Sequence, residues 1–152
     1  MPGTLTLAIN GDMTAFSRLY ADNYKKLYYV AYHSLANTDE AVEAVKTTAD
    51  QAYAEIGRCK TEEEFGRFML KKLCSRIILR YREYRTASPG IESNPPYIKA
   101  QMSKLTDAER LSVSIWSVYG FGSREISELT GIAEEVVAKK LESGKNRIAS
   151  KL

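Results

Sequence analysis

Proline divides this chain into two segments that can each form helices. Three of the four prolines fall within residues 86–96. Proline lacks the amide donor that a helix requires and restricts the residue before it, so no helix continues through this stretch. On both sides, long runs without proline repeat apolar residues at spacings of three and four, as amphipathic helices do. We therefore predict an all-α fold of two small helical lobes, residues 1–85 and 105–152, joined by a linker at 86–104.

The apolar pattern predicts three helices in the first lobe. The first spans residues 12–35, the second spans 37–57 after an Asn-Thr-Asp cap, and the third spans 61–85 after a Thr-Glu-Glu-Glu capping box. In the third helix the predicted core face consists of Leu70, Leu73, Ile77, Tyr81 and Tyr84. Five of the ten tyrosines lie in the first helix. We expect these five to pack or to lie on the surface, in preference to forming a stacking platform for bases.

Positive charge is concentrated in the third helix. Residues 1–57 hold four lysines and arginines against seven acids, a net −3, whereas residues 58–85 hold nine against four, a net +5. Lys72, Arg76 and Arg80 follow one another at i, i+4 spacing on a flank of the predicted core face. Such a stripe suits a phosphate backbone, and it suits a solvent-exposed helix face equally well. The stripe alone leaves both interpretations open.

Few residues could support catalysis or metal binding. The chain holds one histidine, His33, and two cysteines, Cys59 and Cys74. A zinc site would need carboxylates to complete its ligands, and a catalytic triad has only one possible imidazole base. We predict a protein that is not an enzyme and needs no metal or cofactor. The two cysteines, the absence of a leader segment and the absence of an apolar run of membrane length favour a reduced, cytoplasmic setting without a membrane partner.

The second lobe has the pattern of a helix-turn-helix. A Thr-Asp-Ala-Glu capping box at 106–109 opens a helix that ends at the Gly-Phe-Gly sequence of 120–122. We expect Ser123 to cap a short helix, Thr130-Gly131 to form a tight turn, and an amphipathic helix to complete the lobe. In this motif the second helix normally enters the major groove of DNA. A helical hairpin used only for packing is the alternative.

Four stretches of sequence, two in each lobe, carry a resemblance to a known family. In the second lobe they are Tyr119-Gly-Phe-Gly-Ser-Arg-Glu-Ile-Ser-Glu-Leu-Thr-Gly-Ile132 and the following Val136-Val-Ala-Lys-Lys-Leu141. In the first lobe they are Phe16-Ser-Arg-Leu-Tyr20 and Leu70-Lys-Lys-Leu-Cys-Ser-Arg76. The second lobe resembles region 4 of bacterial sigma factors, and the first is similar to region 2. Two such lobes joined by a linker resemble the extracytoplasmic-function type of sigma factor.

The resemblance implies a transcription-initiation protein with RNA polymerase core and promoter DNA as partners. The first lobe would dock on polymerase and open the minus-ten element, and the second would bind the minus-thirty-five element. An anti-sigma factor is a further partner that the family implies. The implied polymerase contacts lie on the second helix of the first lobe: Glu40, Glu43, Lys46 and Thr47.

The implied DNA contacts come from both lobes. In the first lobe they are the cations that would engage the minus-ten element: Lys72, Arg76, Arg80 and Arg82. Tyr81 or Tyr84 would stack on bases if exposed. In the second lobe they lie at the start of the short helix and along the last one: Ser123, Arg124, Glu134, Glu135, Val136, Ala138, Lys139, Lys140, Lys145 and Arg147. Glutamates at the start of the last helix oppose phosphate, so we expect weak, salt-sensitive binding.

Departures from the family pattern leave a second hypothesis open. The docking helix of the family favours a glutamine, an acid and a phenylalanine where this chain has Lys46, Thr47 and Ala49. Ala138 stands where the family's lysine follows the valine. The alternative is a degenerate sigma-like regulatory module, which acts by binding a sigma or anti-sigma partner without productive promoter recognition.

Overall fold

A computed structural model describes residues 3–87 and 107–149, with side chains for 3–83 and 107–146. Within these ranges all regular structure is helical, which confirms the predicted all-α class for this part of the chain. The elements are α1 (Thr4–Ile9), α2 (Met13–Leu35), α3 (Thr38–Ala54), the 3-10 helix η1 (Ile56–Arg58), α4 (Glu62–Ala87), α6 (Asp107–Tyr119), α7 (Ser123–Thr130) and α8 (Glu134–Ala149). The predicted linker at 86–104 lies almost entirely outside the described residues.

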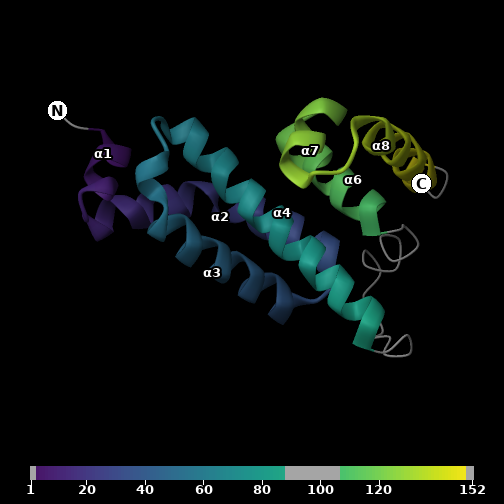
Figure 1. The fold of residues 1–152 in the computed structure, drawn as a ribbon, viewed down its shortest axis with the longest axis horizontal. Helices are drawn as coiled ribbons and strands as arrows, with labels where there is room; N and C mark the ends of the chain where they lie inside the picture. The colour runs from purple at the N-terminus through teal and green to yellow at the C-terminus, as the bar shows by residue number, and fades with distance from the viewer. Residues whose placement is uncertain (1–2, 88–106, 150–152) are drawn as a thin grey trace.

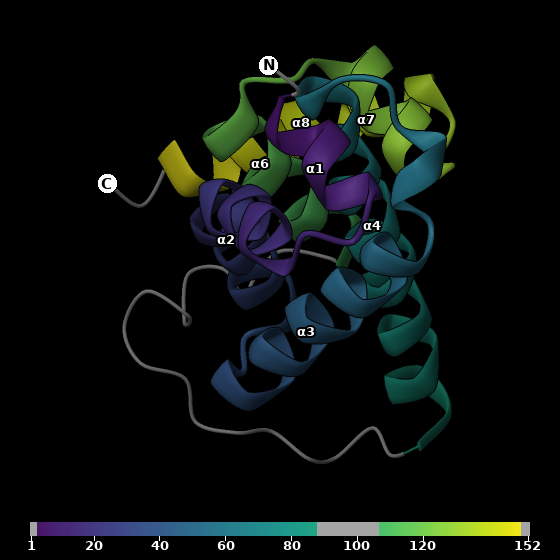
Figure 2. The same ribbon diagram turned by 90° about the vertical axis from the view of Figure 1, so that its left-hand side faces the viewer.

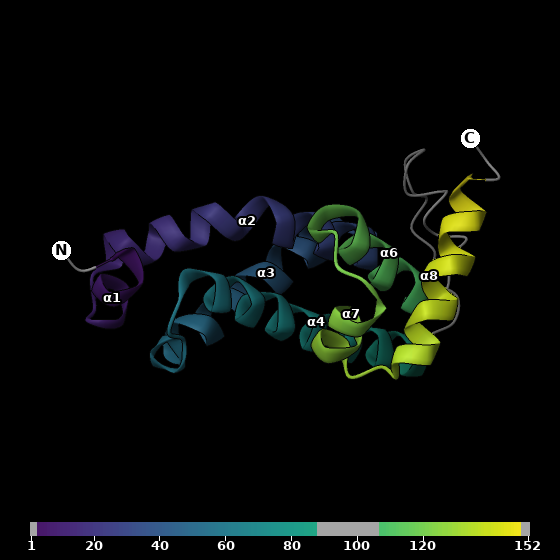
Figure 3. The ribbon, with the colours of Figure 1, turned by 90° about the horizontal axis from the view of Figure 1, so that it is seen from above.

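Three long helices, α2, α3 and α4, run side by side along the long axis of the molecule (Figure 1). α1 packs against α2 at one end, and α6, α7 and α8 gather toward the other (Figures 1 and 3). Seen from the α1 end, α3 covers one side of the α2–α4 pair and α6–α8 lie on the opposite side (Figure 2). α6 packs against both α2 and α8, and α7 packs against α4. None of the described helices has the length and apolarity needed to cross a membrane.

The core face of α4 follows the predicted period. Leu70, Leu73 and Ile77 are fully buried, and Tyr81 is only 4% exposed. The hydroxyl of Tyr81 donates a hydrogen bond of 2.7 Å to the backbone oxygen of Ser34 in the last turn of α2. Burial confirms the predicted place of Tyr81 on the core face, so the condition for stacking on bases, exposure of its ring, is not met. The side chain of Tyr84 lies outside the described residues.

Side-chain caps start α2 and α3, and the cap of α3 at Asn37 is the one that the sequence predicts. Asp12 accepts from the Ala15 amide at 3.0 Å, and Asn37 accepts from the Glu40 amide at 3.0 Å. A carbonyl or carboxylate oxygen in this position satisfies an amide that has no partner inside the helix. The sequence did not predict α1, because six residues with two buried side chains are too few to display a helical period.

One predicted cap in the C-terminal half is wrong. Ser123 was expected to cap α7, but Ser123 is already the first helical residue and Gly122 occupies the cap position. The carboxylate of Glu125 accepts a hydrogen bond of 2.8 Å from the Gly122 amide, so the acid three residues on supplies the cap. The expected turn is present at Gly131, whose φ of 77° lies in the left-handed region that favours glycine.

Candidate nucleic-acid interface

α8 is held by one face and open on the other. Val137 and Leu141 are buried on the held face, and Gly144 lies between them and the end of the helix. A Cβ atom placed on Gly144 would lie 2.6 Å from Cγ2 of Val113 in α6, which is closer than two carbons can approach. Glycine therefore allows α6 and α8 to pack closely at this point.

The open face of α8 carries half of the contacts that were predicted for the minus-thirty-five element. Its exposed side chains are Glu134, Glu135, Val136, Ala138, Lys139, Glu142 and Asn146. No carboxylate among the described side chains forms a salt bridge with Lys139. The face is thus accessible and mixed in charge, with carboxylates around a lysine that is available for phosphate.

The remaining predicted contacts of the second lobe flank this face. Lys140 is half-buried, and the ammonium of Lys145 lies 4.0 Å from the ring centroid of Trp116. A lysine over an aromatic face is a cation–π contact, which holds Lys145 against α6. Arg124 is exposed on α7 beside Glu128, at 3.8 Å, and Ser123 is half-buried. The side chain of Arg147 lies outside the described residues.

A groove follows the same edge of α8. It has a volume of about 410 Å³ and runs between the end of α6, the start of α7 and α8. Trp116, which is 39% exposed, forms its apolar wall, and Ser123, Glu142 and Asn146 provide polar groups. Glu142 and Asn146 were not among the predicted contacts, although they follow Glu135 and Lys139 at helical spacing on the same side.

The cationic stripe of α4 lies along the edge that faces α3 and η1. The ammonium of Lys72 lies 2.8 Å from a carboxylate oxygen of Glu55 and 5.3 Å from the ring centroid of Phe68. The hydrogen bond from Lys72 lowers the pKa of the Glu55 carboxyl. The structure therefore gives Lys72 a protein partner, and a phosphate would have to compete with Glu55 for it.

Arg80 is bound more extensively than Lys72. Its Nε lies 3.1 Å from Oε1 of Glu40, its Nη2 contacts the same oxygen, and its Nη1 lies 2.7 Å from Oε2 of Glu83. These hydrogen bonds, chiefly the ones to Glu40, raise the pKa of the Arg80 guanidinium. Arg76 lines a small cavity with Glu40 and Glu43, whereas Arg82 is exposed. The stripe is thus a row of cations set against the carboxylates of α3.

The predicted polymerase contacts differ in accessibility. Glu43 and Lys46 are exposed on α3, whereas Thr47 is half-buried. Glu40 is also half-buried, and its carboxylate is occupied by Arg80. Glu43 and Lys46 are therefore open to a partner. Glu40 is instead bound by Arg80, a residue that was predicted to contact DNA.

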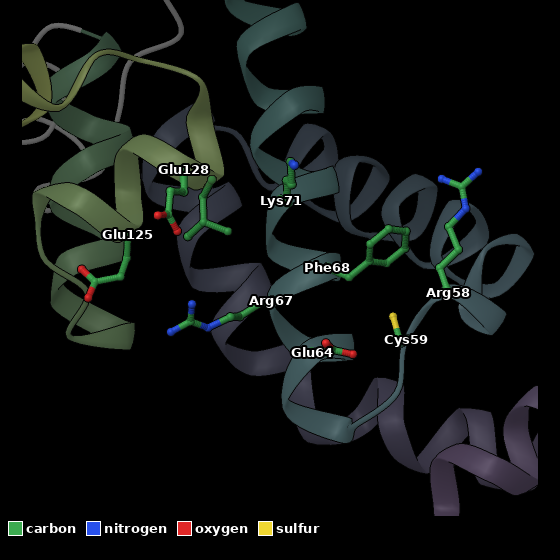
Figure 4. Close-up of a pocket in the computed structure, with 9 residues that line it drawn as sticks. Arg58, Cys59, Glu64, Arg67, Phe68, Lys71, Glu125 and Glu128 are labelled. Atoms are coloured by element: carbon green, nitrogen blue, oxygen red, sulfur yellow. The ribbon is translucent and has the colours of Figure 1, made fainter.

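Sequence reasoning missed a cleft between α4 and α7 that Figure 4 shows. It has a volume of about 320 Å³. Arg67 points from α4 toward the α7 side, where Glu125 and Glu128 lie, and Lys71 also lines the cleft (Figure 4). The guanidinium of Arg67 lies 4.9 Å from the ring centroid of Phe121. The i, i+4 spacing of Arg67 and Lys71 was the available signal for a second cationic row.

Four tyrosines of α2 pack within the protein, in line with the expectation that these residues pack or lie on the surface. Tyr20, Tyr24, Tyr28 and Tyr32 form a continuous row, with neighbouring ring centroids 5.6, 5.9 and 5.9 Å apart. All four are partly buried against the hydrophobic core. The fifth, Tyr29, is 38% exposed, so the five tyrosines divide between packing and surface as expected.

Burial raises the pKa of both cysteine thiols. Cys59 and Cys74 are buried and free, and burial raises the pKa of the Cys74 thiol to about 12. Among residues 3–87 and 107–149, no three His, Cys, Asp or Glu side chains come together in a group that could hold a metal ion. No protein-family model matches the chain, and no curated protein matches its sequence.

Proposed function

We propose that this protein is a sigma-like transcription-initiation factor that binds promoter DNA and RNA polymerase core. The open face of α8 is the observation that carries the proposal. On the opposite face Val137 and Leu141 are buried and Gly144 approaches α6 closely, while Lys139 meets no carboxylate among the described side chains. A helix that is fixed on one side and exposed on the other suits docking in the major groove.

The proposal includes a helix-turn-helix in the second of two lobes, residues 105–152. Three features support it: α7 has eight residues, only residues 131–133 separate it from α8, and Gly131 closes the turn in the left-handed conformation. Short connections with glycine are typical of this motif. In the first lobe, residues 1–85, α3 would dock on polymerase through Glu43, Lys46 and Glu40, and the cations of α4 would engage the minus-ten element.

Gel filtration of the purified protein with RNA polymerase core tests this proposal. We expect co-elution at micromolar concentration, together with core-dependent transcription from at least one promoter. Glu43→Arg should weaken co-elution because it reverses an exposed predicted contact on α3. Asp50→Arg is the matched control, since it makes the same change at another exposed position of α3. Failure of the wild-type protein to bind core at micromolar concentration would contradict the proposal.

A protein-binding regulatory module is the second candidate function. The pairing of Lys72 with Glu55 and of Arg80 with Glu40 favours it, because these cations are already neutralised inside the protein. Under this hypothesis the chain binds a sigma or anti-sigma protein and does not read a promoter. The core-binding assay separates the two candidates, since only the first requires a complex with polymerase core.

A further inference from the structure

One ion pair joins the two surfaces that are proposed to bind different partners. Glu40 lies on α3 among the proposed polymerase contacts, and Arg80 lies on α4 among the proposed DNA contacts. Two guanidinium nitrogens of Arg80, Nε at 3.1 Å and Nη2, donate to Oε1 of Glu40. Glu83 accepts from the third nitrogen at 2.7 Å. While this pair is intact, Arg80 occupies the carboxylate that is proposed to bind polymerase, and Glu40 occupies the guanidinium that is proposed to bind DNA.

The pair can be reached from solvent and is incompletely satisfied. The side chain of Arg80 is 36% exposed and that of Glu40 is 22% exposed. The second carboxylate oxygen of Glu40, Oε2, is buried and accepts no hydrogen bond from any described residue. A small cavity of about 30 Å³ adjoins it, lined also by Glu43 and Arg76. A buried carboxylate oxygen without a donor weakens an ion pair, so a ligand with a better donor set can replace Arg80.

We propose that the Glu40–Arg80 pair makes two ligands bind cooperatively, a cationic segment of a partner protein on Glu40 and the phosphate backbone of DNA on Arg80. This inference rests on the proposed function and adds a regulatory step to it. A partner lysine or arginine that takes Glu40 frees Nε and Nη2 of Arg80 for phosphate, and phosphate that takes these two nitrogens releases Glu40. Linkage makes the effect reciprocal, so each ligand raises the affinity for the other by the same factor.

The free protein should therefore bind DNA more weakly than its cations allow, and breaking the pair should remove this restraint. We would measure equilibrium binding of a short fluorescent DNA duplex to the full chain without polymerase. Glu40→Gln should tighten binding by about fivefold and steepen the salt dependence by about one phosphate contact. Asp39→Asn is the matched control, because it removes the same charge at an exposed neighbouring position on α3. We expect it to leave the affinity within about twofold, since salt screens exposed charges.

A double-mutant cycle separates release of Arg80 from the loss of a negative charge. In an Arg80→Gln background, Glu40→Gln should give no gain in DNA affinity. A gain that persists without Arg80, or one that Asp39→Asn reproduces, would overturn the proposal. Circular dichroism would check folding, and Glu40→Ala provides a second variant in which the carboxylate is absent. Equal DNA affinities for wild type, Glu40→Gln and Glu40→Ala would also overturn it.

Binding of polymerase core supplies the reciprocal measurement. Arg80→Gln frees Glu40, so it should tighten core binding in the absence of DNA by about the same factor. If the wild-type protein binds core and DNA but neither substitution tightens either complex, the coupling is wrong and the proposed function stands. If the wild type and all variants fail to bind both core and DNA, the proposed function is wrong, and the coupling fails with it.

Discussion

The cations of α4 and α8 have different surroundings, although the resemblance to sigma factors implies DNA contacts on both helices. On α4, Lys72 and Arg80 meet Glu55 and Glu40 across the boundary with α3 and η1. On α8, Lys139 faces outward and meets no carboxylate among the described side chains. A cationic stripe on one helix therefore says little until the charge of the neighbouring helix is known. The comparison predicts that α8 contributes more than α4 to DNA binding by the free protein.

The largest expected effect concerns the close contact between α6 and α8 at Gly144. Gly144→Ala places a methyl group 2.6 Å from Cγ2 of Val113, a stiff β-branched side chain that cannot move away freely. We expect the free energy of unfolding to fall by about 1–2 kcal/mol, after allowing for the better helix propensity of alanine. Denaturant titration measures this change, and DNA binding should weaken with it if α8 is the main interface.

A second glycine provides the control for Gly144. A Cβ atom on Gly57, in η1, would meet nothing within 4 Å. Gly57→Ala should therefore change the free energy of unfolding by less than about 0.5 kcal/mol. If both substitutions have the same effect, the close contact between α6 and α8 is not what holds α8.

A smaller effect is expected at the contact between α4 and α2. Tyr81→Phe removes the hydroxyl that donates to the backbone oxygen of Ser34, one of the last carbonyls of α2. Because Ser34 is buried, the carbonyl finds no water in its place, and we expect a loss of about 1 kcal/mol in thermal or denaturant unfolding. Tyr53→Phe is the control, since Tyr53 is 40% exposed and keeps its ring contact with Phe16. A neutral Tyr81→Phe would show that this bond contributes little.

The smallest expected effect is on the pKa of Glu55, which reports whether Lys72 of the α4 stripe is paired with it. The hydrogen bond from Lys72 lowers the pKa of Glu55, so this pair stabilises the fold above the unfolded carboxyl pKa. The contribution is lost as pH falls through the lowered pKa of the folded state. Lys72→Met should return the pKa of Glu55 toward its ordinary value in an NMR titration of carboxyl carbons.

Lys71→Met is the matched control for this titration, because Lys71 is the exposed neighbour of Lys72 on α4 and forms no salt bridge with Glu55. It should leave the pKa of Glu55 as it is in the wild type. An unchanged pKa in the Lys72→Met protein would show that Lys72 is not bound to Glu55 in solution and is available for phosphate.

Local patterns predicted the parts of the fold that depend on neighbours in sequence. The buried face of α4, with Leu70, Leu73 and Ile77, follows from helical spacing alone. The predicted cap at Asn37 depends on an amide three residues away. Such features are fixed within one or two turns of helix, so a single sequence contains them.

The contacts between helices could not be predicted in the same way. Glu40 and Arg80 are forty positions apart, and their pairing depends on how α3 and α4 are rotated against each other. The cleft between Arg67 and Glu128 depends likewise on where α7 packs on α4. Side-chain periodicity identifies the buried face of each helix but not the neighbour that covers it. The pairing of the α4 cations with carboxylates of another helix was therefore not visible in the sequence.

The most direct test compares Lys139→Gln and Lys72→Gln in DNA binding by the free protein across a range of salt concentrations. Both substitutions remove one positive charge, and only the location differs. We predict that Lys139→Gln weakens binding and lowers the slope of log affinity against log salt by about one, while Lys72→Gln leaves the slope nearly unchanged. A slope that Lys72→Gln lowers as much as Lys139→Gln, or that Lys139→Gln does not change, would contradict the assignment of DNA binding to the open face of α8.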